Sequence, residues 1–249
     1  MKIFINKLFK LFGLKLIKYR YFMYSQKLLK KYNFIRYLDQ IESHNFQKIF
    51  NIANYSKSEN SQDIMVLDQL KFKKDGFFVE FGAGNGKDFS NTYLLEKIYN
   101  WNGILSEPCK SFHQELVKNR KCKINFNAVS NRSGLNVGFK EFKNKHYSKI
   151  NNDKKNISYF VQTISLIDLL NSYECPKEFD YLSIDTEGSE FEIIKDFDFK
   201  YYKPRIISIE HNFINTKKKS IFDLLLKNGY VNIFNKISDQ DSWYILKNN

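Results

Sequence analysis

The sequence predicts an α/β protein in which a mostly parallel sheet carries helices on both faces. From residue 61 onward, short apolar segments alternate with segments of helical spacing, and this alternation is typical of parallel sheets. Three glycines at alternate positions, Gly82, Gly84 and Gly86, follow directly on the apolar segment 77–81. Glycine has no Cβ and tolerates a positive φ, so a ligand can approach the backbone where this strand ends.

The alternating segments define the expected elements in chain order. Seven strands are expected, over residues 77–81, 103–108, 124–129, 179–185, 205–212, 230–234 and 243–246. Residues 135–139 are expected as a further strand or one half of a hairpin. The expected helices span residues 64–70, 90–99, 112–117, 164–170, 190–197 and 221–226. Residues 143–158 are rich in Asn and Lys, which predicts an exposed loop of the kind that often contacts substrate.

The 249-residue chain carries a formal net charge of +13, and this charge is unevenly distributed. Residues 1–38 contain ten Lys or Arg residues and no acid, so the rest of the chain carries only +3. We therefore expect two regions, a basic helical N-terminal extension over residues 1–60 and one domain of ordinary size over residues 61–249. Because that domain is nearly neutral, the sequence argues against nucleic acid as a partner.

Residues 1–24 have the pattern of a basic amphipathic helix. Lysines interrupt every apolar run, so no stretch is long enough to span a bilayer or to serve as the apolar core of a secretory signal. Two interpretations remain open. The helix lies on an anionic membrane surface, or it packs on the domain and leaves its lysines in water.

The three cysteines, Cys109, Cys122 and Cys175, form no CxxC pair and no metal-ligand spacing. Unpaired thiols indicate a reducing compartment, so we expect a cytoplasmic location, with peripheral membrane contact through residues 1–24 as the open alternative. Each cysteine is expected to act as a small buried apolar residue.

Four of the expected strands end in polar residues. Glu80, Glu107 and Asp185 end three of them, and the fourth ends in Glu210 followed by His211. In an open α/β sheet the carboxyl ends of the parallel strands converge on the ligand crevice. Since a lone buried carboxylate is unfavourable, a ligand with hydroxyl groups and a cationic amine would supply the missing partners.

Glu107 comes one helix and one strand after the glycine turn. An acid at this place can accept hydrogen bonds from both ribose hydroxyls of a bound nucleoside. The alternative is a carboxylate beside Pro108 that stabilises the N-terminus of the next helix.

The glycine pattern itself narrows the class of ligand. It is Glu80-x-Gly82-x-Gly84-x-Gly86, which differs from the dinucleotide fingerprint G-x-G-x-x-G, and no Lys-Ser or Lys-Thr closes it as in a phosphate loop. The chain from about Ser61 to Leu246 resembles the FkbM-type S-adenosylmethionine-dependent methyltransferases. The resemblance rests on segments 76–83, 90–92, 95–97, 101–104, 107–108, 119–120, 128–130, 163–170 and 181–190. Asn85 departs from it, because an acid is common at that place in the family.

The resemblance implies a Rossmann-like methyltransferase fold with a seven-stranded sheet, S-adenosylmethionine as cofactor, and methyl transfer to an oxygen. The acceptor would be a hydroxyl or carboxyl group on a sugar, a glycan or another small natural product. By analogy, the glycine turn would hold the methionine part, Glu107 the ribose, and Asn127 with Ala128 the adenine. The implied cofactor site comprises Glu80, Gly82, Ala83, Gly84, Asn85, Gly86, Glu107, Asn127 and Ala128.

An alcohol acceptor needs a base for its proton, and the candidates lie at the strand ends. His211 is favoured because imidazole titrates near neutral pH, with Asp185 orienting it or the substrate and Glu187 beside them. A purely structural His211 remains an alternative. A divalent metal on Asp185, Glu187 and His211 is a second possibility, but their spacing is not diagnostic and no metal is expected.

Three rival functions remain open from the sequence. The first is a non-catalytic module that uses the methyltransferase fold at a membrane surface, because a fold does not fix a function. The second is a nucleic-acid methyltransferase, which the nearly neutral domain and the lack of an Asn-Pro-Pro-Tyr base-handling motif disfavour. The third is a nicotinamide oxidoreductase, which the glycine spacing disfavours.

Overall fold

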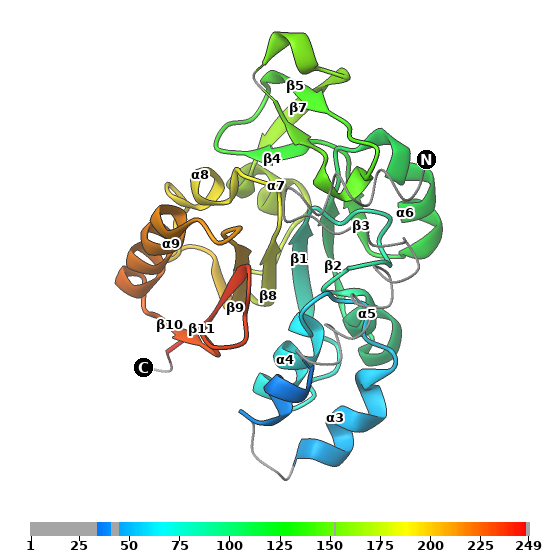
Figure 1. Ribbon diagram of the computed structural model, residues 1–249. Helices are drawn as coiled ribbons and strands as arrows, with labels where there is room; N and C mark the ends of the chain where they lie inside the picture. Colours follow the sequence, from blue (N-terminus) through cyan, green and yellow to red (C-terminus); the bar gives the residue numbers. More distant parts are fainter. Residues whose placement is uncertain (1–33, 41–44, 152, 248–249) are drawn as a thin grey trace, which may run out of the picture.

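The computed structural model describes residues 34–40, 45–151 and 153–247 and shows one main sheet with a smaller sheet beside it (Figure 1). The main sheet has seven strands in the order β10-β11-β9-β8-β1-β2-β3. Their bounds are β1 Phe77–Phe81, β2 Asn102–Ser106, β3 Lys123–Asn125, β8 Glu178–Ile184, β9 Lys203–Glu210, β10 Tyr230–Ile233 and β11 Asp241–Leu246. Among the described strands of this sheet, only β11 runs antiparallel to its neighbours, β9 and β10. The predicted seven-stranded, mostly parallel sheet is therefore confirmed.

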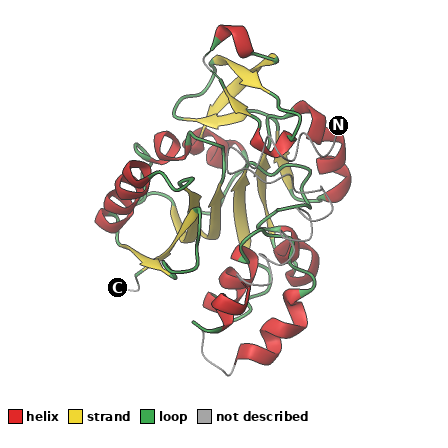
Figure 2. Cartoon of the chain, viewed as in Figure 1, coloured by secondary structure: helices red, strands yellow, loops and turns green. Residues whose placement is uncertain are grey.

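Helices cover both faces of this sheet, as the alternating sequence pattern predicts (Figure 2). On one face, Val79, Leu182 and Ile207 pack in one core with apolar residues of α7, α8 and α9. On the other, Phe78, Tyr181 and Ile206 pack with residues of α3, α4, α5 and α6. The alternation of side chains along each strand separates these two cores. The helices are α3 Phe46–Ala53, α4 Gln62–Gln69, α5 Tyr93–Tyr99, α6 His113–Asn119, α7 Leu166–Ser172, α8 Glu190–Ile194 and α9 Asn215–Lys227.

A second sheet lies between β3 and α7 in the chain, with the strand order β4-β7-β5-β6; we call it the small sheet. Its strands are β4 Ala128–Ser130, β5 Asn136–Lys140, β6 Lys149–Ile150 and β7 Tyr159–Ser165. The short helices η3 Lys145–Tyr147 and η4 Lys154–Asn156 connect β5 to β7 around β6. Figure 1 shows this sheet at the top of the view, beyond the ends of the main strands.

The small sheet corrects three sequence expectations. The expected strand 124–129 is two strands in two sheets, because the Asn125 side chain accepts a hydrogen bond from the Asn127 N–H at 2.8 Å and the chain turns there. The expected helix 164–170 begins later, since Ile164 and Ser165 still pair with β4. The expected loop 143–158 contains β6 and two short helices. The strand expected over residues 135–139 forms one residue later, as β5 Asn136–Lys140, and pairs antiparallel to β6 and β7.

The described part of the N-terminal extension packs on the domain. Residues 34–38 and α3 are helical, and Tyr37 and Ile49 are fully buried in the same core as Trp243. The Tyr37 hydroxyl donates to Asp68 Oδ2 of α4 at 2.9 Å. The predicted amphipathic helix over residues 1–24 lies outside the described residues, and the boundary at residue 60 stays a prediction. Among the described helices, none combines the length and the apolar composition that a membrane crossing requires.

Candidate functional site

The glycine turn is pressed against the end of strand β8. Gly82, Gly84 and Gly86 all have positive φ, at 71°, 54° and 76°. A Cβ on Gly82 would lie 1.7 Å from the carbonyl oxygen of Asp185, and one on Gly86 would lie 2.6 Å from Leu116 Cδ1. Only glycine allows this backbone conformation and this close approach together. The turn therefore brings Gly82 directly beside Asp185.

Glu107 lies on the other side of the same turn, just after β2. Its Oε2 accepts a hydrogen bond from the Gly84 N–H and its Oε1 from the Cys109 N–H, both at 2.7 Å. Burial raises the pKa of this carboxyl to about 7, because the two amide hydrogen bonds offset only part of the cost of removing the charge from water. Among the described residues no other group donates to these two oxygens, so each keeps a lone pair for a ligand. The acid predicted to bind ribose is thus fixed against the glycine turn.

Glu80, which was predicted to contact the methionine part, faces the protein. Its carboxylate accepts hydrogen bonds from the Ser90 hydroxyl at 3.0 Å, the Asn91 N–H at 2.7 Å and the Thr92 hydroxyl. These bonds fix the segment that leads from the glycine turn into α5. The direct contact of Glu80 with a ligand stays a prediction.

Arg120, at the end of α6, holds the underside of the turn, and its side chain is fully buried. Its Nε donates to Glu96 Oε2 at 2.7 Å, and its Nη1 donates to the Gly86 carbonyl at 3.2 Å and lies 3.6 Å from Glu80 Oε2. Burial raises the pKa of Glu96, but the guanidinium more than compensates and lowers it to about 2. No role for Arg120 could be predicted, because a single arginine has no sequence pattern that shows its burial.

The remaining predicted cofactor residues surround the turn. The Asn85 side-chain oxygen accepts from the Lys87 and Asp88 N–H groups at 3.0 and 2.8 Å, so an amide closes the loop where the family commonly has an acid. Ala83 is buried in the core beneath the turn. The Asn127 carbonyl accepts from Ser106, and Ala128 packs in a small core with Cys109. Both therefore lie next to the end of β2, and their contact with adenine stays a prediction.

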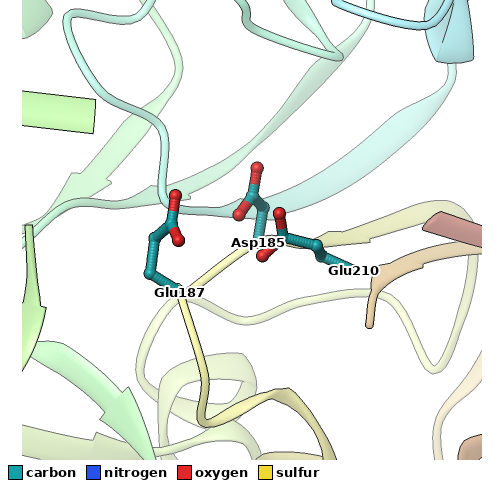
Figure 3. A group of neighbouring side chains, drawn as sticks. All are labelled: Asp185, Glu187 and Glu210. Atoms are coloured by element: carbon teal, nitrogen blue, oxygen red, sulfur yellow. The ribbon is translucent and has the colours of Figure 1, made fainter. Parts of the chain in front are cut away.

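Three carboxylates meet at the ends of β8 and β9. One oxygen from each of Asp185, Glu187 and Glu210 lies within 4.8 Å of the others, and Figure 3 shows the three side chains pointing toward one another. Burial, reinforced by the neighbouring negative charges, raises the pKa of Asp185 well above its usual range and that of Glu210 to about 8. Carboxyls held in this way accept or share a proton near neutral pH, and together they offer three oxygen atoms to a hard cation.

His211 is separate from this carboxylate group. It is 1% exposed, its Nδ1 accepts from the Phe213 N–H at 3.1 Å, and burial lowers its pKa. The metal ligands suggested from the sequence were Asp185, Glu187 and His211. In the described structure it is Glu210, and not His211, that lies with the other two acids. Adjacent residues point in different directions along an extended chain, so the exact end of β9 decides which of the two enters the site. His211 as the base stays a prediction.

One further side chain at the turn comes from the small sheet. The ring of His146, in η3, lies over Gly84, where a Cβ would be 3.4 Å from its Cε1 atom. The same ring packs against Phe89 and Phe112, with centroid distances of 4.9 and 5.0 Å. No sequence signal indicated this contact, because 62 positions separate His146 from Gly84.

These features define a class of protein. A glycine turn after the first strand of a parallel sheet, with an acid after the next strand, is the arrangement of Rossmann-like nucleoside-binding enzymes. The sequence profile of the methyltransferase FkbM domain matches residues 80–231, which is more than half of the chain. The chain therefore belongs to the FkbM methyltransferase family.

Comparison with curated proteins finds no significant match. Among solved structures, precorrin-6y C5,15-methyltransferase from Geobacter metallireducens GS-15 is 13% identical with a TM-score of 0.41, covering 74% of this chain and 84% of that one. Methyltransferase FkbM from Methylobacillus flagellatus KT is 10% identical with a TM-score of 0.49, covering 81% of this chain and 59% of that one. A putative RNA methyltransferase from Pyrococcus horikoshii is 11% identical with a TM-score of 0.38, covering 70% and 68%. These likenesses are too remote to assign a substrate.

Gly82→Ala tests the contact between the glycine turn and β8. The new methyl group would collide with the Asp185 carbonyl, and we expect a loss of roughly 3 kcal/mol or more in the free energy of unfolding. Gly134→Ala is the matched control, because Gly134 has the similar φ of 76° but no atom within 4 Å of the added Cβ. We expect it to cost only about 1–2 kcal/mol. Equal losses in urea denaturation would contradict the close packing of the turn.

Arg120→Met tests the buried ion pairs. Removing the guanidinium leaves Glu80 without its cation and Glu96 with only the more exposed Lys97, so we expect a loss of about 3–5 kcal/mol in the free energy of unfolding at pH 7. Lys97→Met is the control, because Lys97 also contacts Glu96 but is more exposed, and it should cost less than about 1 kcal/mol. Urea denaturation measures both, and a loss for Arg120→Met as small as that for Lys97→Met would show that the buried pairs do not hold the turn.

Proposed function

We propose that the chain uses S-adenosylmethionine to methylate a hydroxyl oxygen of a sugar, a glycan or another small polyhydroxylated molecule. One observation supports this most strongly, the contact between Gly82 and Asp185. It joins the nucleoside end of the site, at the glycine turn and Glu107, to the carboxylate group at β8 and β9. Methyl transfer requires such a pairing of a donor site with a base.

The residues at the turn fit an adenosyl cofactor. Glu107 offers two carboxylate oxygens to ribose hydroxyls, and the glycines put no side chain into the turn, beside which the methionine part would lie. Asn127 and Ala128, which lie next to the end of β2, would border the adenine. When bound, the cofactor supplies an activated methyl group, so the protein's main task is to position the acceptor oxygen.

The carboxylate group favours a hydroxyl acceptor over a carboxyl acceptor. A carboxylate substrate would place another negative charge beside Asp185, Glu187 and Glu210, whose mutual repulsion already raises the pKa of Asp185 and of Glu210, and repulsion between partly buried charges is stronger than in water. A neutral molecule with several hydroxyls would instead donate hydrogen bonds to the same oxygens. A polyhydroxylated acceptor therefore suits the charges of the site.

Asp185 and Glu210 are the groups that we propose accept the acceptor's proton. Their raised pKa values make one of them a base of useful strength near neutral pH, and the second carboxyl stabilises the protonated form by a hydrogen bond. His211 is the alternative base, because a neutral imidazole is a common proton acceptor in enzymes, and burial keeps this one neutral by lowering its pKa.

Three variants separate these roles. We expect Asp185→Asn and Glu210→Gln to lower kcat by about 10²- to 10⁴-fold with little change in affinity for adenosylhomocysteine, because a base acts only in the chemical step. His211→Gln should lower kcat by less than about tenfold. Transfer of labelled methyl groups to a panel of neutral sugars and sugar acids measures the rates, with a chelator arm that reports any need for a divalent cation. Wild-type turnover in both carboxyl variants would refute the assignment, and a large loss confined to His211→Gln would transfer it to the histidine.

The pH dependence of cofactor-product binding tests Glu107. Its pKa of about 7 means that the carboxyl is protonated below neutral pH and charged above it. The charged form accepts hydroxyl hydrogen bonds more strongly, so affinity for adenosylhomocysteine should rise as the pH increases from about 6 to 8. Glu107→Gln should bind more weakly and remove most of this slope. Calorimetry at several pH values measures both, and an unchanged slope in the variant would exclude Glu107 from the ribose site.

A further inference from the structure

We propose that residues 141–148, which connect β5 to β6, form a strap that closes the cofactor site and must move aside before the cofactor binds. This inference rests on the function proposed above. Within the strap, the His146 ring is the group that fills the site. The strap would then control the access of the cofactor and the release of its spent product.

The position of His146 is the first step of the argument. Gly84 has no side chain, and its N–H is directed to Glu107, so a nucleoside bonded to Glu107 would lie against this glycine. The His146 ring already lies there, at 3.4 Å from the place of a Cβ on Gly84. The ring and the ligand would therefore compete for one volume.

The partners of the ring lie on both sides of the turn. Phe89 belongs to the segment after the glycines, and Phe112 to the segment after β2. The ammonium group of Lys145 lies 5.6 Å from the centre of the Phe112 ring. The strap thus joins the two segments between which a nucleoside would enter.

Glu141 attaches the strap at its beginning. Its carboxylate accepts hydrogen bonds from the Ser111 hydroxyl and, at 2.8 Å, from the Tyr159 hydroxyl. The Tyr159 oxygen in turn accepts from the Lys110 N–H at 3.0 Å. These bonds hold the base of the strap to the segment that also carries Cys109, whose N–H binds Glu107. The strap and the ribose acid are therefore parts of one hydrogen-bonded unit.

The contacts of the strap beyond Glu141 are weak enough to break during binding. Its short helix η3 has no buried residue, and Tyr147 beside His146 is 58% exposed. Segments with few buried apolar contacts open at low cost in free energy. Only the open fraction of molecules could bind the cofactor, so the apparent affinity would be the intrinsic affinity multiplied by that fraction, and loss of the ring should raise it.

Three variants test the strap by calorimetric titration with adenosylhomocysteine. We expect His146→Ala to bind about tenfold more tightly than the wild type, as for a site that is closed in about 90% of molecules. Tyr147→Ala, which removes an exposed neighbour, should match the wild type. His146→Phe keeps a ring over Gly84 and should not gain affinity. Equal or weaker binding by His146→Ala beside a binding wild type would overturn the strap and leave the proposed function intact. Failure of every variant and of the wild type to bind would overturn both.

Amide hydrogen exchange gives an independent readout on the wild type. Saturating adenosylhomocysteine should slow exchange in residues 82–92 and speed it in residues 141–148, because the ligand displaces the strap. Slower exchange in both segments would show that the strap closes over the ligand and would overturn displacement.

Discussion

The guanidinium of Arg120 lies fully buried between two carboxylates, and the ligand-binding edge of the sheet depends on this arrangement. Glu80 fixes the segment that leads into α5, and Glu96 belongs to α5 itself. The same guanidinium donates to the carbonyl of Gly86, so one side chain joins the glycine turn to both acids. Buried charges of this kind are stable only when all partners are present, which makes the turn a rigid part of the molecule. Rigidity here matters because the turn must hold Glu107 on one side and meet Asp185 on the other.

The alternation of side chains along the strands determines which polar residues share one face of the main sheet. Glu80, Ser183 and Glu210 share the face of the sheet that carries Phe78 and Tyr181, while the residues between them enter the opposite core. At the carboxyl end this face becomes polar, and the half-buried carboxylates of Asp185 and Glu187 meet the buried one of Glu210. The raised pKa values that result make these groups bases rather than permanent charges. The acids at this edge of the sheet can therefore accept hydrogen bonds from a ligand with several hydroxyl groups. One of them can also accept the proton of the reacting hydroxyl.

The sequence was sufficient to predict the main sheet, the glycine turn and the acids at the strand ends, because each depends on local patterns of spacing. It was insufficient for the small sheet, since β4 has three residues and β6 has two, which is too short for any period to show. Arg120 and His146 act through contacts with residues distant in sequence, which no single-residue pattern reveals. Whether Glu210 or His211 enters the site depends on the residue at which β9 ends, which the sequence did not define. A shift of one residue along the strand reverses which side chain faces the site.

The central claim is that the glycine turn and the carboxylate group form one methyl-transfer site. A crystal structure of the protein with adenosylhomocysteine tests it most directly. The account predicts that both ribose hydroxyls lie within hydrogen-bond distance of Glu107 and that the sulfur faces Asp185 and Glu210, with His146 moved away from Gly84. A ligand bound elsewhere, or one whose sulfur faces away from the three carboxylates, would contradict it.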